Sequence, residues 1–317
     1  LKVLAVETPL SLQAHPDLAQ AREGFAREER ARVPIGAAER NYKDDNHKPE
    51  MLCALGPFEA LSGFRAPAEA ASLLAELGLE SSELVQALAS REPEPLRAAF
   101  DLLMGLEGAP KARLLEQIVS RATQAATQGS RFAPSFHWAV RLAGYFPGDI
   151  GAACSLLLNY IALEPFEAVF LEAGRLHAYL KGVGVELMAN SDNVLRGGLT
   201  PKHVDVPELR RVLRFDDQVI LPVPLRAHDG ELQYQTPARE FALSRIELDG
   251  AAAFDAHMTG PELLLCTDGR VELATPGASS APLVLRKGAA CFVPASQGGF
   301  RASGRGRLFR AAVPATS

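Results

Sequence analysis

The sequence predicts a mainly β protein with an α-helical insert. Short apolar segments separated by Gly and Pro turns occupy both ends of the chain, which is typical of a β-sandwich or jelly roll rather than a βαβ fold. Between about Pro67 and Ala126 the chain is rich in Ala, Leu, Glu and Gln, and its apolar residues recur at helical spacing. The length of 317 residues suggests about two domains at roughly 150 residues each, which leaves room for substantial cores.

These changes in composition set the expected boundaries. Residues 1–65 and 131–225 are expected to form a first β-unit, residues 66–130 a helical insert, and residues 226–317 a second β-unit without a metal site. Prolines and glycines interrupt the insert, so several short helices are expected there. In the second β-unit, Gly269 and Gly288 are expected at strand–turn–strand positions. The short apolar segments predict strands at 1–6, 168–171, 184–188, 262–266, 283–285 and 291–294.

Charge and composition exclude several classes of protein. There are 33 basic and 38 acidic residues, whereas a protein that binds nucleic-acid phosphates usually carries a basic excess. No apolar run approaches the roughly 20 residues that span a bilayer, and the opening segment lacks a signal-peptide layout, so a soluble cytoplasmic protein is expected. The four cysteines form no CxxC pair, which argues against a disulfide scaffold or a cysteine zinc site. No glycine-rich phosphate loop is present.

The first polar motif is Ser11-Leu12-Gln13-Ala14-His15-Pro16. In a strand, alternate side chains share a face, so Ser11, Gln13 and His15 point one way while Leu12 and Ala14 point into apolar packing. Three polar groups on one face could line an interior wall. The alternative is a strand end whose polar residues face solvent.

The second motif is Asn46-His47-Lys48-Pro49-Glu50-Met51. If this segment is extended, Lys48 and Glu50 share a face, and the apolar residues 51–55 continue it into a core. Buried charges are costly without partners, so a metal for the carboxylate and an anionic substrate for the lysine are expected. The alternative is a surface turn of solvated charges.

The third polar region extends from residue 174 to residue 202. His177 and Tyr179 share a strand face, and if the strand is regular so do Glu186, Met188, Asn190 and Asp192. Arg196 is followed by glycines that permit close approach of a ligand, and with Lys202 it forms a pair of cations suited to a phosphate. Two histidines, a glutamate and a glutamine could form a nitrogen and oxygen metal site, which fits catalytic Zn²⁺ but also non-haem Fe²⁺.

These motifs resemble the signatures of the type I mannose-6-phosphate isomerase family. The run from 186 to 202 contains the specific core Ser-Asp-Asn-x-x-Arg-x-Gly-Leu-Thr-Pro-Lys. The resemblance covers almost the whole chain in order, and its other motifs are residues 11–16, 46–51, 147–151 and 177–180.

The resemblance implies two cupin-type jelly rolls with a helical domain inserted into the first, and one Zn²⁺ per chain in that first barrel. It implies an enzyme that interconverts mannose 6-phosphate and fructose 6-phosphate through a cis-enediol. It implies a phosphosugar as the only partner and a monomeric chain. By position, the implied zinc ligands are Gln13, His15, Glu50 and His177. The other implied roles are Arg196 beside the reacting carbons, Ser11 and Lys202 at the phosphate, and Lys48, Glu186 and Asp192 in proton handling.

The sequence departs from the family pattern at two places. Family members have a segment before the first motif that contributes early barrel strands, and without it an opened barrel with exposed strand edges is expected. Phe166 stands where the family has glycine in a Pro-Gly-Glu turn, and this is expected to affect turn geometry more than chemistry. Two other functions stay open: a non-catalytic phosphosugar-binding remnant, and an Fe²⁺-dependent cupin oxygenase.

Overall fold

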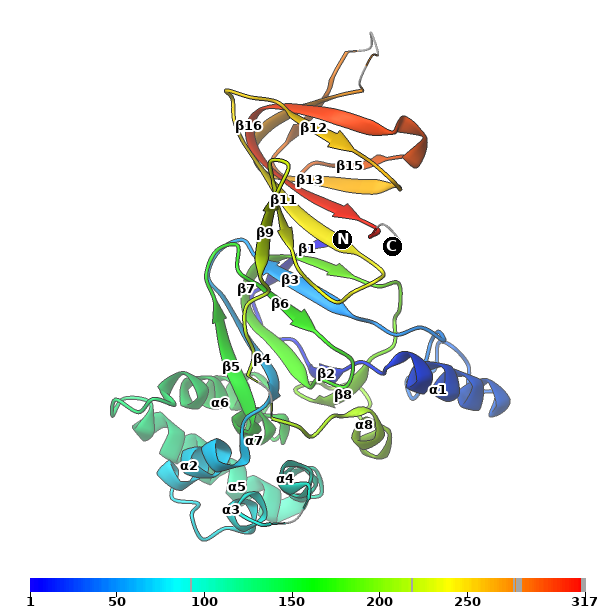
Figure 1. Cartoon of the computed structure of the whole chain (residues 1–317). Helices are drawn as coiled ribbons and strands as arrows, with labels where there is room; N and C mark the ends of the chain where they lie inside the picture. The colour runs from blue at the N-terminus through cyan, green and yellow to red at the C-terminus, as the bar shows by residue number, and fades with distance from the viewer. Residues whose placement is uncertain (92, 218, 276, 278–280, 315–317) are drawn as a thin grey trace.

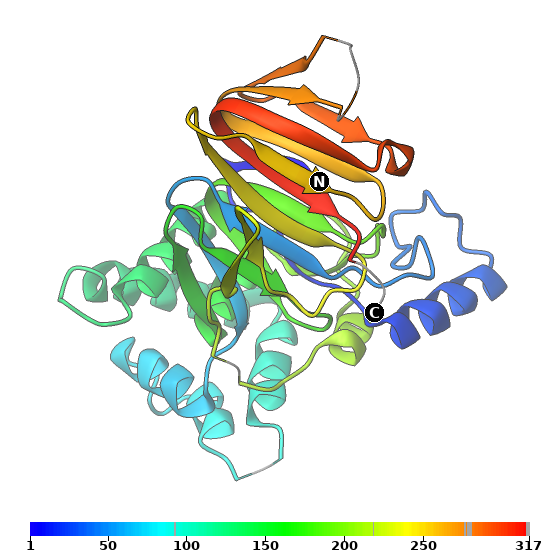
Figure 2. The same ribbon diagram turned by 45° about the horizontal axis from the view of Figure 1, so that its top comes forward.

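The molecule is built from two antiparallel sheets with helices attached to the first. The computed structural model describes residues 1–317 except 92, 218, 276, 278–280 and 315–317. Within the described residues, each sheet has eight strands, and the second sheet lies on the side of the first that faces away from most of the helices (Figures 1 and 2). The predicted fold class, mainly β with a helical part, is therefore confirmed.

The first sheet brings distant parts of the chain together around one long strand, β7. This strand pairs with β1, β2, β3 and β4, and β6 extends the sheet beyond β3. Chain segments separated by more than 100 residues therefore meet at β7. The strands of this sheet are β1 Lys2–Val6, β2 Leu12–Ala14, β3 Glu50–Ala54, β4 Phe58–Phe64, β5 Leu158–Leu163, β6 Ala168–Leu171, β7 His177–Met188 and β8 Leu195–Gly198.

The second sheet is formed by the C-terminal part of the chain and packs face to face on the first. Met51, Cys53 and Val185 of the first sheet share a buried cluster with Leu243 and Phe309 of the second. The strands are β9 Leu225–His228, β10 Glu231–Tyr234, β11 Ala242–Asp249, β12 Phe254–His257, β13 Glu262–Ala274, β14 Leu283–Arg286, β15 Ala290–Val293 and β16 Gly299–Ala312, with a 3-10 turn, η2, at Ala295–Gln297.

The turn expected at Gly269 is wrong. Strand β13 continues through this residue, and its pairing with β16 shifts register between Cys266 and Asp268, which marks a β-bulge. Gly269 has a φ of 70°, and a Cβ there would collide with the carbonyl oxygen of Arg305. Glycine is therefore needed for the bulge rather than for a chain reversal.

The prediction of several short helices in the insert is confirmed by the helices that lie between β4 and β5. Leu73, Leu84 and Phe100, taken from three of these helices, are all buried in one core cluster. None of the helices in the described part of the chain is long and apolar enough to cross a membrane. The helices are α1 Leu18–Arg30, α2 Pro67–Glu76, α3 Glu83–Leu88, α4 Pro95–Met104, α5 Gly108–Ala125, α6 Ala133–Tyr145, α7 Gly151–Cys154, the 3-10 turn η1 Ser155–Leu157, and α8 Val206–Val212.

Candidate metal centre

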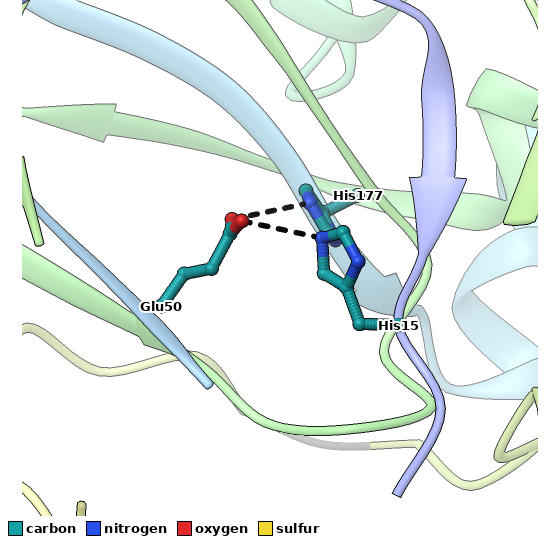
Figure 3. Close-up of side chains that lie close together, drawn as sticks. All are labelled: His15, Glu50 and His177. Carbon is teal, nitrogen blue, oxygen red and sulfur yellow. Dashed lines mark ion pairs between the residues drawn. The ribbon is translucent and has the colours of Figure 1, made fainter. Parts of the chain in front are cut away.

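Three buried side chains converge inside the first sheet. His15 follows β2, Glu50 begins β3 and His177 begins β7. Both rings point at the Glu50 carboxylate (Figure 3), with 3.4 Å from His15 Nε2 to Glu50 Oε1 and 3.8 Å from His177 Nε2 to Glu50 Oε2. One ligand atom from each residue lies within 4.8 Å of the others. The strand pairing of β7 with β2 and β3 therefore assembles a compact nitrogen and oxygen donor set.

Backbone carbonyls fix the orientation of both imidazole rings. His15 Nδ1 lies 2.7 Å from the carbonyl oxygen of Asn193, and His177 Nδ1 lies 2.9 Å from that of Arg175. A carbonyl oxygen can only accept, so each Nδ1 donates a proton and each Nε2 of a neutral ring keeps its lone pair. Burial, with a contribution from His15, lowers the pKa of His177 to about 4. His177 is therefore neutral at neutral pH, as a metal ligand must be.

The donor set meets the requirements of a zinc ion. Burial alone would raise the pKa of Glu50, but His15, Lys48 and His177 outweigh it and hold the pKa well below its usual range. An anionic carboxylate thus faces the Nε2 atoms of the two rings. Among the described residues, His15 Nε2 and Glu50 Oε2 are buried and have no hydrogen-bond partner. A divalent cation would satisfy all of these atoms, and zinc accepts imidazole and carboxylate ligands.

Gln13 lies at the edge of this group. Its side-chain nitrogen is 3.4 Å from His177 Nε2, and the two residues are cross-strand partners in β2 and β7. A half-turn of the amide exchanges its nitrogen for its oxygen at this position. Gln13 can therefore offer an oxygen to the same centre.

Two lysine–carboxylate pairs lie on the strands of the first sheet or directly before one of them. Lys48 Nζ is 2.9 Å from Glu50 Oε1, as the shared face predicted from sequence requires. Lys2 Nζ is 3.0 Å from Glu186 Oε2, across the pairing of β1 with β7. Burial, and then the charge of Glu50, raises the pKa of Glu186, while Lys2 lowers it. Sequence reasoning missed Lys2, because nothing local indicates that it pairs with a residue 184 positions away.

The tyrosine on the His177 face is also buried. Within the described residues, the Tyr179 hydroxyl has no hydrogen-bond partner. Burial, followed by the charges of Glu50 and Glu186, raises its pKa well above the usual value, so the hydroxyl keeps its proton. Tyr179 therefore presents a neutral hydroxyl donor in the same interior as the carboxylates of Glu50 and Glu186.

Arg196 and Asp192 occupy different surroundings. Arg196 on β8 is the cross-strand partner of Gln13, so the two side chains share a face. The common face expected for Glu186, Met188, Asn190 and Asp192 is wrong beyond Met188, because β7 ends there and Asp192 is an exposed loop residue. The loop conformation is set instead by hydrogen bonds such as that from the Asp192 amide to Asp44 Oδ2 at 2.8 Å.

The two residues expected at a phosphate lie at the ends of strands. Ser11 is half-buried just before β2, and Lys202 is exposed after β8. The Lys202 side chain makes no hydrogen bond or ion pair with the part of the chain that the structure describes, and it is available to an anion. Within the described part of the chain, no hydrogen bond or ion pair joins these two residues to each other or to the buried donor set.

Asp149, in the motif at residues 147–151, holds the loop that connects Arg196 with Lys202. Asp149 Oδ1 accepts from the Gly151 amide at 2.7 Å, and Oδ2 accepts from the Thr200 amide at 3.2 Å. Gly198 has a φ of 124°, and a Cβ there would lie 2.8 Å from Asp149 Oδ1. Asp149 therefore fixes the loop between Arg196 and Lys202, and only glycine fits against it.

Comparison with known proteins gives consistent matches. A family profile described as "Phosphomannose isomerase type I, catalytic domain" matches residues 1–67. Mannose-6-phosphate isomerase from Salmonella typhimurium is 38% identical over 98% of this chain and 77% of the relative, and the human protein of that name is 34% identical over 93% and 72%. A crystal structure of zinc-bound mannose 6-phosphate isomerase superposes with a TM-score of 0.89 at 36% identity, covering 98% of this chain and 77% of that one.

Proposed function

The chain belongs to the type I phosphomannose isomerase family, and from this premise we propose that it interconverts mannose 6-phosphate and fructose 6-phosphate with one zinc ion per chain. The observation that carries the proposal is the buried group of His15, Glu50 and His177. Its ligand atoms lie close enough together to hold a metal ion, and two of them, His15 Nε2 and Glu50 Oε2, have no hydrogen-bond partner among the described residues. The sequence-based identification of the family is confirmed.

We assign the zinc ligands to His15, Glu50, His177 and Gln13. The first three converge directly, and Gln13 adjoins them through His177. When bound, zinc supplies a Lewis acid that polarises a sugar oxygen. The carbonyls that accept from the Nδ1 atoms of both rings support the assignment, because such outer contacts orient metal-binding histidines.

The reaction moves a proton between two carbons of the open-chain sugar. A base removes the C2 proton of the aldose, the electron pair forms the C1=C2 bond, and O1 takes a proton to give the cis-enediol. O2 then gives up its proton, the carbonyl forms at C2, and C1 receives a proton. We assign proton handling to Lys48, Glu186 and Asp192, of which the first two lie in the interior with Glu50.

We assign the remaining polar groups to charge stabilisation and positioning. Arg196 shares the face of Gln13 and stabilises negative charge on the sugar oxygens as the enediol forms. Ser11 and Lys202 hold the phosphate, which aligns the reacting carbons by binding the remote end of the sugar. The phosphate contacts thus act through binding energy rather than through the chemical step.

Neither alternative function is favoured. An iron-dependent oxygenase does not agree with the isomerase names of the relatives or with the zinc-bound neighbour. A binding remnant is distinguished from the isomerase by turnover. We further propose that the chain is cytoplasmic, which its four free cysteines support, and that it is a monomer, which light scattering would test.

The test of the function is to follow the reaction by NMR in deuterium oxide. The zinc-loaded chain should convert mannose 6-phosphate into fructose 6-phosphate and exchange solvent deuterium at C1 or C2 during turnover. Unphosphorylated mannose is the matched control and should react far more slowly, because it lacks the group that Ser11 and Lys202 hold. Binding of fructose 6-phosphate without conversion would contradict the isomerase assignment and favour the remnant.

A further inference from the structure

We propose that Asn193 is a positioning residue that sets the zinc affinity of His15 by clamping the loop before β3 to the loop after β7. The inference rests on the proposed function only in taking His15 as a zinc ligand. It concerns a residue that is assigned neither as a zinc ligand nor as a sugar contact, and that acts on His15 through its own backbone carbonyl.

Asn193 uses both its backbone and its side chain at once. It is fully buried, and its carbonyl oxygen accepts from His15 Nδ1 at 2.7 Å. Its side-chain oxygen accepts from the amides of Lys43 at 2.7 Å and Asp44 at 3.2 Å. Its side-chain nitrogen lies 2.8 Å from the Asp44 carbonyl, 3.2 Å from Asp44 Oδ1 and 2.9 Å from the Asn46 carbonyl. One buried amide therefore ties the His15 acceptor to the opposite loop.

Further hydrogen bonds hold the same two loops in register. The Ser191 hydroxyl donates to the Asn46 carbonyl at 3.1 Å, and Asn46 donates through its side chain to the Asn190 carbonyl at 3.2 Å. The Asn193 amide also donates to Ser191 Oγ at 3.2 Å. Because one loop leads into Lys48 and Glu50 and the other into Arg196, the clamp fixes the spacing of segments that carry the proposed site.

The position of the Asn193 carbonyl determines what His15 can offer a metal. While that carbonyl accepts from Nδ1, the neutral ring keeps its lone pair on Nε2, which faces Glu50. If the carbonyl moved, the ring could rotate or carry its proton on Nε2. Part of the zinc-binding free energy would then be used to restore the ring orientation and tautomer, and zinc would bind more weakly. Loss of such an outer contact typically weakens metal binding by about 10–100-fold.

The experiment compares Asn193→Ala and Asn193→Asp with the wild-type chain. Zinc affinity is measured by competition with a chromogenic chelator, and the His15 tautomer by ¹⁵N NMR of the metal-free protein, with His15 assigned from a His15→Gln variant. Asn193→Ala removes every side-chain hydrogen bond of Asn193. Asn193→Asp keeps the acceptor oxygen but replaces the donating amide nitrogen with a carboxylate oxygen, which faces the Asp44 carboxylate. Both should bind zinc about 10–100-fold more weakly, and both should show loss of the pure Nδ1–H tautomer.

A matched control separates positioning from general loss of stability. Ser82→Ala removes the N-cap contact to the Val85 amide at the start of α3, in the helical region. It should lower the melting temperature and leave zinc affinity and the His15 tautomer unchanged. If Asn193→Ala does not fold, Asp44→Asn tests the same clamp from the other side, because it replaces one acceptor oxygen with an amide nitrogen. The variant therefore loses either the acceptor for the Asp192 amide or the acceptor shared by the Asn193 side chain and the Asn46 amide.

The outcomes are distinguishable. Weaker zinc binding and a mixed tautomer in the clamp variants alone support the inference. Equal zinc affinity in wild type and Asn193→Ala, or equal weakening in Ser82→Ala, overturns it and leaves the proposed function intact. A wild-type chain that binds no zinc overturns the proposed function and this inference together.

Discussion

The Lys48 ammonium lies 2.9 Å from Glu50 Oε1, the carboxylate oxygen that also faces His15 Nε2 at 3.4 Å. The other carboxylate oxygen faces His177 and has no hydrogen-bond partner among the described residues. One buried carboxylate therefore joins the candidate metal centre to a cation assigned to proton handling. A change at Glu50 should for this reason affect both metal binding and catalysis, whereas a change at Glu186, which pairs with Lys2, should affect catalysis alone.

Replacement of the two interior carboxylates should have different effects. Glu50→Gln removes the anionic ligand, so zinc affinity should fall by at least tenfold, judged by metal content after dialysis against a weak chelator. Glu186→Gln should retain zinc, because Glu186 pairs with Lys2 rather than with the histidines, and should lower kcat about 10²–10⁴-fold. Equal zinc loss in both variants would contradict the assignment of Glu50 alone as the carboxylate ligand.

The two cations near β8 should affect different kinetic constants. Arg196→Ala should mainly lower kcat, by about 10²–10³-fold, because it removes charge stabilisation at the reacting carbons. Lys202→Ala should mainly raise KM, because it weakens binding of the phosphate. Steady-state kinetics on both variants is the measurement. Equal losses of kcat would refute this division of roles.

Phe166 is a strained residue that holds the two sheets together. Its φ is 72°, a region that favours glycine, and the guanidinium carbons of Arg245 and Arg307 lie 4.2 Å and 4.1 Å from its ring centroid. Phe166→Ala should destabilise the fold, because it loses these contacts and keeps the strain. Phe166→Gly also loses them but relieves the strain, so it should be about 1 kcal/mol more stable than Phe166→Ala. Urea unfolding measures the difference, and an alanine variant at least as stable as the glycine variant would contradict the account.

Two helical glycines should respond oppositely to alanine. Gly144→Ala in α6 meets nothing within 4 Å and should stabilise the protein by about 0.5–1 kcal/mol through helix propensity. In α1, a Cβ on Gly24 would overlap the ring of Tyr42, which is fully buried, so Gly24→Ala should destabilise by about 1–3 kcal/mol. Thermal unfolding of both variants checks the signs. Stabilisation by Gly24→Ala would show that Tyr42 moves freely.

Local patterns predicted the features that depend on neighbouring residues. Alternation placed Lys48 and Glu50 on one face, and their side chains form an ion pair. Helical periodicity located the helices between β4 and β5. Helix α1 was not predicted, although Asp17 and Gln20 form a capping box that is visible in the sequence.

Features that depend on long-range pairing could not be read from local patterns. The Lys2–Glu186 ion pair needs the register of β1 against β7. The sequence does not distinguish Asn193 from the polar residues beside it, because its hydrogen-bond partners lie in a loop about 150 residues earlier. Gly269 marked a bulge rather than a turn, since both use the same left-handed conformation and only the partner strand distinguishes them.

The central claim is that the buried group of His15, Glu50 and His177 holds a zinc ion on which isomerisation depends. The most direct measurement is a coupled assay of mannose 6-phosphate conversion before chelation, after chelation and after zinc re-addition, with the zinc content of each sample determined. The account predicts one zinc per chain, activity that disappears with the metal, and recovery in proportion to the zinc restored. Full activity in the zinc-free chain, or none in a folded chain that carries one zinc, would contradict it.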